Sequence, residues 1–428
     1  MINKNVIVHL LVIVVLISFM TGGVAVAEEL KGKVTMWGGA HWMKVAEGTL
    51  EKAGFYEKYP NVKVEITGFP FNDIARKERI AVGAGSPRPD VLQTYWTILA
   101  EFMEAGAVID LTERIEPMKN DLLGLEAVTD AEGKTYGLNY DSSMSCVYYR
   151  KDIFEQHGIS LPETHEEWIK ASEKLNALGM YITGFDPETV GTGYPNIILS
   201  MIDGNHFNDK GEYIFDTEEG KGLVAIEAIK TYMKYGYPYV LEDPEGSTAF
   251  VEGKIPSWMS LATTWKHIGV LVKPGMEGYG EWRIGEWPAF KQGGRRVGLH
   301  HPAYLFINKN SKNKEIAWEV VKFLCASSEG VYVRGNEFNL IAAGYVPGLK
   351  KLAEGSKTWE FFGGHEAASI WAKSILDSRP PTVRPHRAAQ EIEHIAGEEC
   401  YKMWKENLSP EEVIKVIGKR SREAIRKY

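Results

Sequence analysis

Lys33-Val34-Thr35-Met36-Trp37 and Val62-Lys63-Val64-Glu65-Ile66 alternate apolar and polar residues in the way that is typical of half-buried β-strands. Residues 42–58, between these strands, and residues 71–83, after them, have the apolar spacing of helices. The order strand, helix, strand, helix predicts a parallel sheet. Because open α/β sheets bind ligands at the carboxyl ends of their strands, we expect functional loops at that edge.

The same pattern continues along the chain, with a further short strand at Asp90–Gln93 and a helix that stops at Gly106. A Ser-rich extended segment, residues 139–149, then leads into a second α/β unit. Strands are expected at 146–149, 255–262, 282–287 and 302–308, and helices at 164–178, 220–235, 314–326 and 409–428. No flexible tether separates the two units, so strand-like crossings are expected to join them.

The N-terminus has the features of a secretory signal. Lys4 precedes an apolar run, Val6–Met20, which is shorter than the roughly 20 residues needed to span a bilayer, and Ala25-Val26-Ala27 matches a small-x-small cleavage site. We therefore expect residues 1–27 to be removed, with a retained N-terminal anchor as the alternative. No cysteine follows the run, so a lipid anchor is not expected and a periplasmic location fits best.

Composition limits the function classes further. The chain has 428 residues, of which 44% are hydrophobic and 25% charged, and this size predicts two domains. A formal net charge of −8 argues against a nucleic-acid partner, which would need a basic surface. Cys146, Cys325 and Cys400 lie far apart without metal-ligand spacing. Two alternatives remain: one pair of cysteines forms a disulfide, or all three are free, buried thiols.

An enzyme is the least favoured class. The sequence contains no G-x-S-x-G, H-E-x-x-H, P-loop or dinucleotide fingerprint. Its 57 acidic residues always offer carboxylate pairs, so pairs alone do not indicate glycoside hydrolysis. His300-His301 lacks a third ligand at a suitable spacing for a metal. No catalytic residue, metal or cofactor is expected.

Several sequence blocks follow one another along nearly the whole mature sequence: Phe55 to Val64 (FYEKYPNVKV), Pro89-Asp90-Val91, Tyr136-Gly137-Leu138, Tyr149-Arg150-Lys151-Asp152, Ala249 to Lys254 (AFVEGK) and Ser311 to Glu315 (SKNKE). In their order and spacing, which are more specific than any one block, they resemble the extracellular solute-binding proteins of the maltose-binding type (family 1). One departure is His300-His301, which stands where the family often has a Gly-rich turn.

The resemblance implies an α/β, two-lobe periplasmic-binding-protein fold of type II, with a cleft between the lobes and three interlobe crossings. We expect the crossings near 139–142, 286–290 and 341–346. The N-terminal lobe would then contain residues 28–139 plus 290–342, and the C-terminal lobe residues 140–289 plus 343–428. The implied function is to capture a carbohydrate and deliver it to the permease subunits of an ABC importer, as a monomer. A sensing protein without a transporter has the same sequence features and remains open.

Aromatic residues at loop ends are candidate ligand contacts, because sugars present flat C–H faces to indole and phenol rings. His41 and Trp42 are expected in a loop after the first strand, although Trp42 could instead pack into its helix. The resemblance implies that Tyr95 and Trp96 contact the ligand.

In the second lobe, Tyr194 lies in a Thr192-Gly193-Tyr194-Pro195 segment that is expected to precede a helix, with ligand contact and helix-start packing both open. Trp265 follows the 255–262 strand, where the family commonly stacks a ring on the sugar. Asp141 and Ser143, in the first crossing, could bind hydroxyl groups or cap turns.

A further group of candidates would line the hinge side of the cleft: His301, Tyr304, Arg384, His386 and Arg387. Positively charged Arg and His side chains there would suit a ligand with a carboxylate or with many hydroxyl groups. The alternative is that these side chains are only solvated or paired with Asp and Glu. The sequence leaves the identity and chain length of the sugar open.

Overall fold

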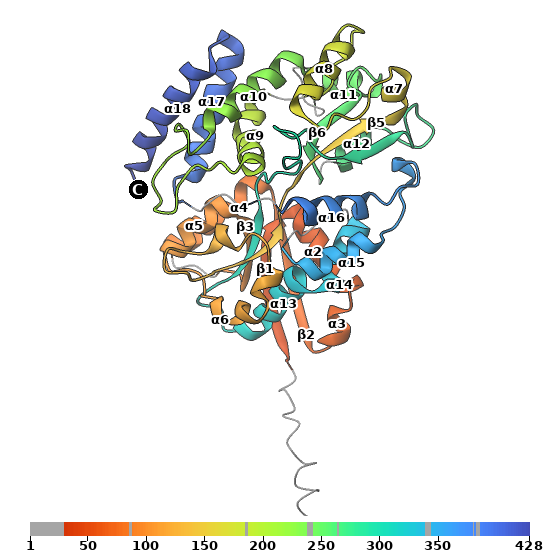
Figure 1. Ribbon diagram of the computed structural model, residues 1–428. Helices are drawn as coiled ribbons and strands as arrows, with labels where there is room; N and C mark the ends of the chain where they lie inside the picture. Colours follow the sequence, from red (N-terminus) through yellow and green to blue (C-terminus); the bar gives the residue numbers. More distant parts are fainter. Residues whose placement is uncertain are drawn as a thin grey trace, which may run out of the picture.

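Two α/β lobes, one above the other in Figure 1, make up the computed structural model. It describes residues 30–84, 88–184, 187–237, 243–262, 265–338, 344–379, 381 and 386–428. Lobe 1 is built on a five-stranded sheet of order β2-β1-β3-β8-β4, and lobe 2 on a three-stranded sheet of order β6-β5-β7. The strands are β1 Gly32–Gly39, β2 Val62–Phe69, β3 Val91–Tyr95, β4 Leu138–Asp141, β5 Ser145–Arg150, β6 Ser257–Leu261, β7 Trp282–Gly285 and β8 Ala303–Ile307.

The predicted parallel sheet is confirmed in lobe 1, where β1 pairs in parallel with β2 and with β3. β8 enters between β3 and β4 and runs antiparallel to both. Every residue of β8 is buried, as expected for a strand covered on both faces. In lobe 2, both strand pairs are antiparallel.

Helices cover both sheets. Those that pack around the lobe 1 sheet are α2 Ala40–Lys52, α3 Phe55–Lys58, α4 Phe71–Ala84, α5 Trp96–Glu104, α6 Thr112–Ile115 and α13 Lys314–Ala326, with 3-10 helices at Glu116–Asp121 and Leu125–Val128. The helix α14, Ser328–Phe338, contacts α2 of lobe 1 and α15 of lobe 2. The helices of lobe 2 are α7 Lys151–Gln156, α8 His165–Asn176, α9 Pro187–Ile202, α10 Gly222–Tyr235, α11 Pro244–Val251, α12 Trp265–Leu271, α15 Val346–Glu354, α16 Ala367–Ser378, α17 Ala389–Glu406 and α18 Pro410–Ile425, with a 3-10 helix at Glu360–Phe362.

Local signals account for some of the helix ends. Thr164 caps α8 by accepting a hydrogen bond from the backbone of Glu167, and Ser409 and Glu412 form a reciprocal capping box at the start of α18. The single helix that we expected over residues 42–58 is wrong, because Gly54 adopts a left-handed conformation (φ 85°) that separates α2 from α3.

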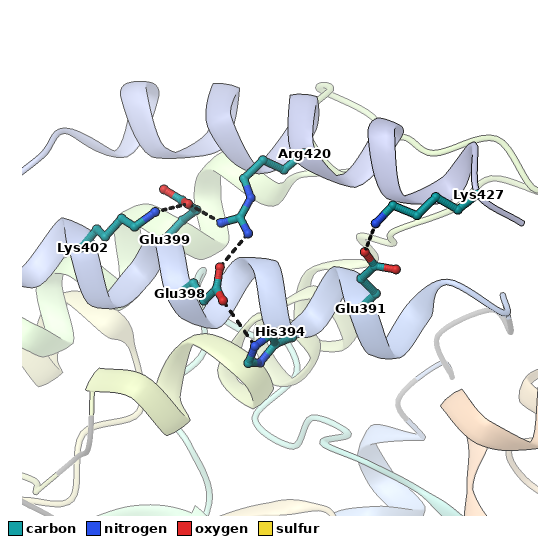
Figure 2. Close-up of polar contacts among 7 residues, drawn as sticks. All are labelled: Glu391, His394, Glu398, Glu399, Lys402, Arg420 and Lys427. Atoms are coloured by element: carbon teal, nitrogen blue, oxygen red, sulfur yellow. Dashed lines mark hydrogen bonds and ion pairs between the residues drawn. The ribbon is translucent and has the colours of Figure 1, made fainter. Parts of the chain in front are cut away.

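The last two helices pack as a pair against α9 and α10, at the upper left of Figure 1. Ion pairs hold them together along their length: Arg420 of α18 lies between Glu398 and Glu399 of α17, and Lys427 pairs with Glu391 (Figure 2). Cys400 of α17 is buried in the lobe 2 core below this pair. All three cysteines of the chain are buried and free, so the disulfide alternative is not realised.

Two crossings between the lobes run side by side. The first connects β4 to β5 through residues 142–144, slightly later in the chain than the expected 139–142, because residues 138–141 form β4 of the lobe 1 sheet. The second passes through Leu299 to Pro302, and its backbone pairs with the first: Met144 and Leu299 form an antiparallel bridge, and the His300 N–H donates to the Ser143 carbonyl at 3.1 Å.

The predicted position of the second crossing, 286–290, is therefore wrong. The Trp287 N–H donates to the Arg296 carbonyl, and the Ala289 N–H donates to the Glu163 carbonyl, so this stretch turns back within lobe 2 before the chain leaves it. The third expected crossing, 341–346, lies partly outside the described residues. Gly344 accepts a hydrogen bond from the Leu123 N–H beside lobe 1. The remaining lobe boundaries stay a prediction.

Close packing at the second crossing requires glycine. A Cβ on Gly298 would lie 2.3 Å from the backbone oxygen of Ile197 in α9, and one on Gly193 would lie 1.6 Å from Nε2 of His300. A backbone oxygen cannot rotate out of the way as a side chain can, so the second crossing and α9 would have to move apart.

We expect Gly298→Ala to lower the free energy of unfolding by about 1–3 kcal/mol, the usual cost of overpacking. Gly269→Ala is the matched control, because its Cβ would come no closer than 3.3 Å to another atom and alanine favours a helix over glycine. Chemical denaturation of both ligand-free variants measures the effect. Equal stability of the two variants would contradict the packing described here.

Candidate functional site

Five of the predicted site residues come together where the two crossings meet lobe 1. The Trp42 indole Nε1–H donates to Oδ2 of Asp141 at 2.8 Å, and the Trp42 ring contacts the Tyr95 ring edge-on, with centroids 6.1 Å apart. The Tyr95 ring in turn lies 5.7 Å from that of His301, and His41 lies against Trp42 at 5.9 Å. We call His41, Trp42, Tyr95, Asp141 and His301 the floor cluster.

The backbone explains why these side chains converge. β1 continues to Gly39 and α2 begins at Ala40, so the expected loop at residues 37–42 is wrong: His41 and Trp42 lie in the first turn of a helix. Tyr95 ends the neighbouring strand β3, and Asp141 ends β4. Three strand ends and the second crossing therefore meet at one edge of the sheet.

Asp141 is a buried carboxylate with both oxygens in use. Oδ2 accepts from Trp42, and Oδ1 accepts from the backbone N–H of Ser143 at 2.9 Å. Burial raises the pKa of Asp141, while these donors and the nearby Arg334 guanidinium act in the opposite direction. Ser143 adopts a positive φ of 45°, a strained conformation that turns its N–H toward Asp141.

Arg334 was not predicted as a site residue. Its guanidinium is fully buried, lies 4.3 Å from the centre of the Tyr140 ring and donates to the carbonyl of Leu324. Its Nε and Nη1 atoms have no hydrogen-bond partner among the described residues. A buried cation next to the first crossing is costly, and no sequence pattern distinguishes it from the other arginines.

A second group of polar residues that sequence reasoning missed lies behind His301. Glu393 of α17 is only 7% exposed; its Oε2 lies 3.0 Å from His301 Nε2, and its Oε1 accepts from the Asn196 amide at 2.7 Å. His206 completes the group, with Nε2 2.8 Å from the Asn196 side-chain oxygen. The signal that could have indicated this group is His300-His301, where two adjacent imidazoles require nearby polar partners.

The second-lobe candidates have other surroundings. The segment expected to precede a helix at Tyr194 lies inside α9, which is a correction. The Tyr194 hydroxyl donates to the Met259 carbonyl at 2.7 Å, and its ring packs edge-on against Trp287. Trp265 is the first residue of α12 and not a loop residue, and its ring lies 5.0 Å from that of Trp359.

Trp96 and Tyr304 pack in the core of lobe 1. Trp96 is 1% exposed, Tyr304 is fully buried, and the Tyr304 hydroxyl donates to the Gly124 carbonyl at 2.7 Å. Both rings belong to the apolar cluster that contains Leu92, Leu99 and Phe102. In this arrangement their contacts are those of core residues, and ligand contact by either ring stays a prediction.

The candidates expected on the hinge side of the cleft do not lie together. Arg384 lies outside the described residues. His386 stacks on Phe207 at 4.2 Å, and burial lowers its pKa, with the nearby Arg387 adding to the effect. Arg387 pairs with Glu104 of lobe 1 at 2.8 Å. His386, Phe207 and Glu104 border a separate cavity of about 610 Å³ between the lobes, so His386 and Arg387 belong to a different part of the interlobe surface from the floor cluster.

Within the described ranges, no group of three or more His, Cys, Asp or Glu side chains is arranged to hold a metal ion. None of the described helices combines the length and apolar composition needed to cross a membrane.

Comparison with known proteins adds a family and a set of relatives. The chain is 24% identical over 358 residues to the arabinooligosaccharide-binding protein of Bacillus subtilis, an alignment that covers 76% of this chain and 78% of the relative. The galacto-N-biose/lacto-N-biose I-binding protein of an ABC transporter from Bifidobacterium longum has a similar structure, with a TM-score of 0.74, 20% identity and coverage of 93% of this chain and 98% of that one. The GacH receptor of Streptomyces glaucescens has a TM-score of 0.70 at 20% identity, with coverage of 94% and 100%.

The two structural likenesses establish a fold, that of two-lobe binding proteins. Family membership rests on a separate observation, because a family model described as "Bacterial extracellular solute-binding protein" matches residues 32–329. The chain belongs to the bacterial extracellular solute-binding protein family.

Proposed function

We propose that this protein captures a carbohydrate in the cleft between its lobes and delivers it to the permease of an ABC importer. The observation that carries the proposal is the floor cluster, in which indole, phenol and imidazole rings surround a fixed carboxylate at the crossings. Apolar ring faces suit the C–H faces of a sugar, and Asp141 and His301 suit its hydroxyl groups. A relative named as an arabinooligosaccharide-binding protein and a structural neighbour named as a galacto-N-biose/lacto-N-biose I-binding protein support the same ligand class.

The proposal includes the location and the absence of catalysis. Residues 1–27 would act as a cleaved signal peptide, with no lipid anchor, and the mature protein would act as a monomer in the periplasm. No cofactor or nucleic acid would take part. Asp141 already accepts two hydrogen bonds within the protein, which suits a fixed acceptor better than an acid or base that must exchange protons.

A thermal-shift panel of mono-, di- and oligosaccharides, with amino acids and inorganic anions as controls, tests the ligand class. A true ligand at 100 times its dissociation constant stabilises the protein by about 2.7 kcal/mol, which gives a clear rise in melting temperature. We expect the rise with one or a few carbohydrates. A rise with a control solute alone would contradict the proposal.

Trp265→Ala is expected to weaken binding of the carbohydrate by roughly 30-fold or more, because truncating an aromatic anchor commonly costs 2 kcal/mol or more of binding. Trp282→Ala is the control: Trp282 is fully buried between Phe250 and Phe361, and its loss should cost about 3–5 kcal/mol of stability. Calorimetric titration and ligand-free melting separate the two effects. Unchanged affinity in a destabilised Trp265→Ala variant would assign this ring to packing.

Small-angle scattering tests the motion of the lobes. If the lobes close around the crossings, the radius of gyration should decrease when the protein is saturated with ligand. The measurement needs the wild-type protein with and without a carbohydrate that the panel has identified. An unchanged radius with proven binding would show that capture does not involve closure.

A further inference from the structure

Glu393 is an unusual residue for its position in α17. Its side chain is buried against α9 and the second crossing, where a carboxylate needs hydrogen-bond donors or a positive charge. Asn196 of α9 supplies a donor to Oε1, and His301 of the crossing faces Oε2 at 3.0 Å. The angles of the His301 contact depart from those of a good hydrogen bond, so the strength of the contact depends mainly on whether the imidazole carries a charge.

Glu393 fixes which way Asn196 points, because its carboxylate oxygen can only accept and therefore faces the Asn196 amide N–H. Burial lowers the pKa of His206 to about 4, so this ring is neutral at physiological pH, although the charge of Glu393 acts in the opposite direction. Its Nε2 lies 2.8 Å from the Asn196 oxygen, which can only accept, so Nε2 carries the proton. Because the Asn196 amide occupies one carboxylate oxygen of Glu393, the second oxygen is left for His301.

The two rings in contact with His301, those of His300 and Tyr95, carry no charge near neutral pH. Burial and the neighbouring His301 lower the pKa of His300 on the crossing. Burial and the Asp141 carboxylate raise the pKa of the Tyr95 phenol at the end of β3. Burial acts to lower the pKa of His301 itself, but Glu393 outweighs it and the net shift is upward.

Glu393 is held rigidly with respect to lobe 2. α17 packs along α9, and its outer face is tied to α18 by Arg420 and Lys427 (Figure 2). His301 lies between this fixed carboxylate and the Tyr95 ring of lobe 1. The charge that faces His301 therefore comes from the C-terminal helices, while the imidazole belongs to the floor cluster.

We propose that Glu393 is a positioning residue that holds His301 as a protonated donor on the floor of the cleft, so that ligand affinity falls when His301 loses its proton. A protonated imidazole donates from both nitrogens, and with Nε2 facing Glu393, Nδ1 is the donor left for a ligand oxygen. A neutral ring that keeps its proton on Nε2 has only an acceptor at Nδ1. The ligand class is a solute rich in hydroxyl oxygens, and this part of the inference rests on the proposed function.

The first test is an NMR titration of the His301 imidazole in the ligand-free, full-length mature protein. In the wild type the titration midpoint should lie above the ordinary value of about 6.5, and in Glu393→Gln it should fall below the wild-type midpoint. Glu399→Gln is the matched control, because Glu399 is also buried in α17 but pairs with Lys402 and Arg420 (Figure 2). This control should lose stability and keep the wild-type midpoint.

The second test measures affinity between pH 5.5 and 8.5 for the carbohydrate that gives the largest thermal shift. The pKa of His301 in the folded protein is raised above its ordinary value. The contribution of His301 to ligand affinity is therefore fully present below about pH 6.5 and is lost as the pH rises through the raised pKa. Wild-type affinity should then fall by up to about tenfold per pH unit, the limit for one linked proton. The fall should shift to lower pH in Glu393→Gln, stay in place in Glu399→Gln and disappear in His301→Gln.

Identical His301 midpoints in the wild type and Glu393→Gln would overturn the inference, and so would wild-type affinity that is constant with pH. If no carbohydrate binds, the proposed function fails and the ligand part of the inference falls with it. The NMR arm would still decide whether Glu393 holds the proton on His301, so the two failures are distinguishable.

Discussion

The backbone pairing of the two crossings is the constraint on which the rest of the site depends. Ser143 and His300 are joined by a backbone hydrogen bond, and Met144 pairs with Leu299 beside them. The Ser145 N–H donates to the Gly298 carbonyl at 2.8 Å, and the Ser145 hydroxyl accepts from the Gly298 N–H at 2.9 Å. Two segments that lie far apart in the sequence are thereby held in one register, and Asp141 and His301 join the same cluster through the rings of Trp42 and Tyr95.

The charges near these crossings are difficult to explain by stability alone. Asp141, Arg334 and Glu393 are all buried, and buried charges are often no more stabilising than apolar side chains of the same size. Lobe 1 has an apolar core elsewhere, which includes the rings of Trp96 and Tyr304. Polar groups that are fixed in advance bind a ligand without the cost of ordering them on binding, which is a reason to keep them at a cleft.

Local sequence predicted most of the elements, because strands and helices depend on the spacing of apolar residues within a short window. β1, β2, α8 and α13 lie close to their expected ranges. Where the prediction was wrong, a neighbour in space had decided the outcome. Gly193 and Pro195 indicated a loop, but the segment is helical because α9 packs closely against the second crossing. The apolar pattern of β7 did not indicate that the chain turns back between Trp287 and Arg296. The second crossing was therefore predicted too early in the chain.

By itself, the sequence determined the α/β class, the parallel sheet of lobe 1 and most residues of the floor cluster, since His41, Trp42, Tyr95 and Asp141 all lie at strand ends or directly after them. Only the tertiary structure decided which of the candidates meet. Trp96 follows Tyr95 directly yet turns into the core, and Glu393 joins His301 from a helix that carries many other acids. The physical reason is that apolar periodicity is a local property of the chain, whereas the partner of a buried charge is chosen by distances in three dimensions.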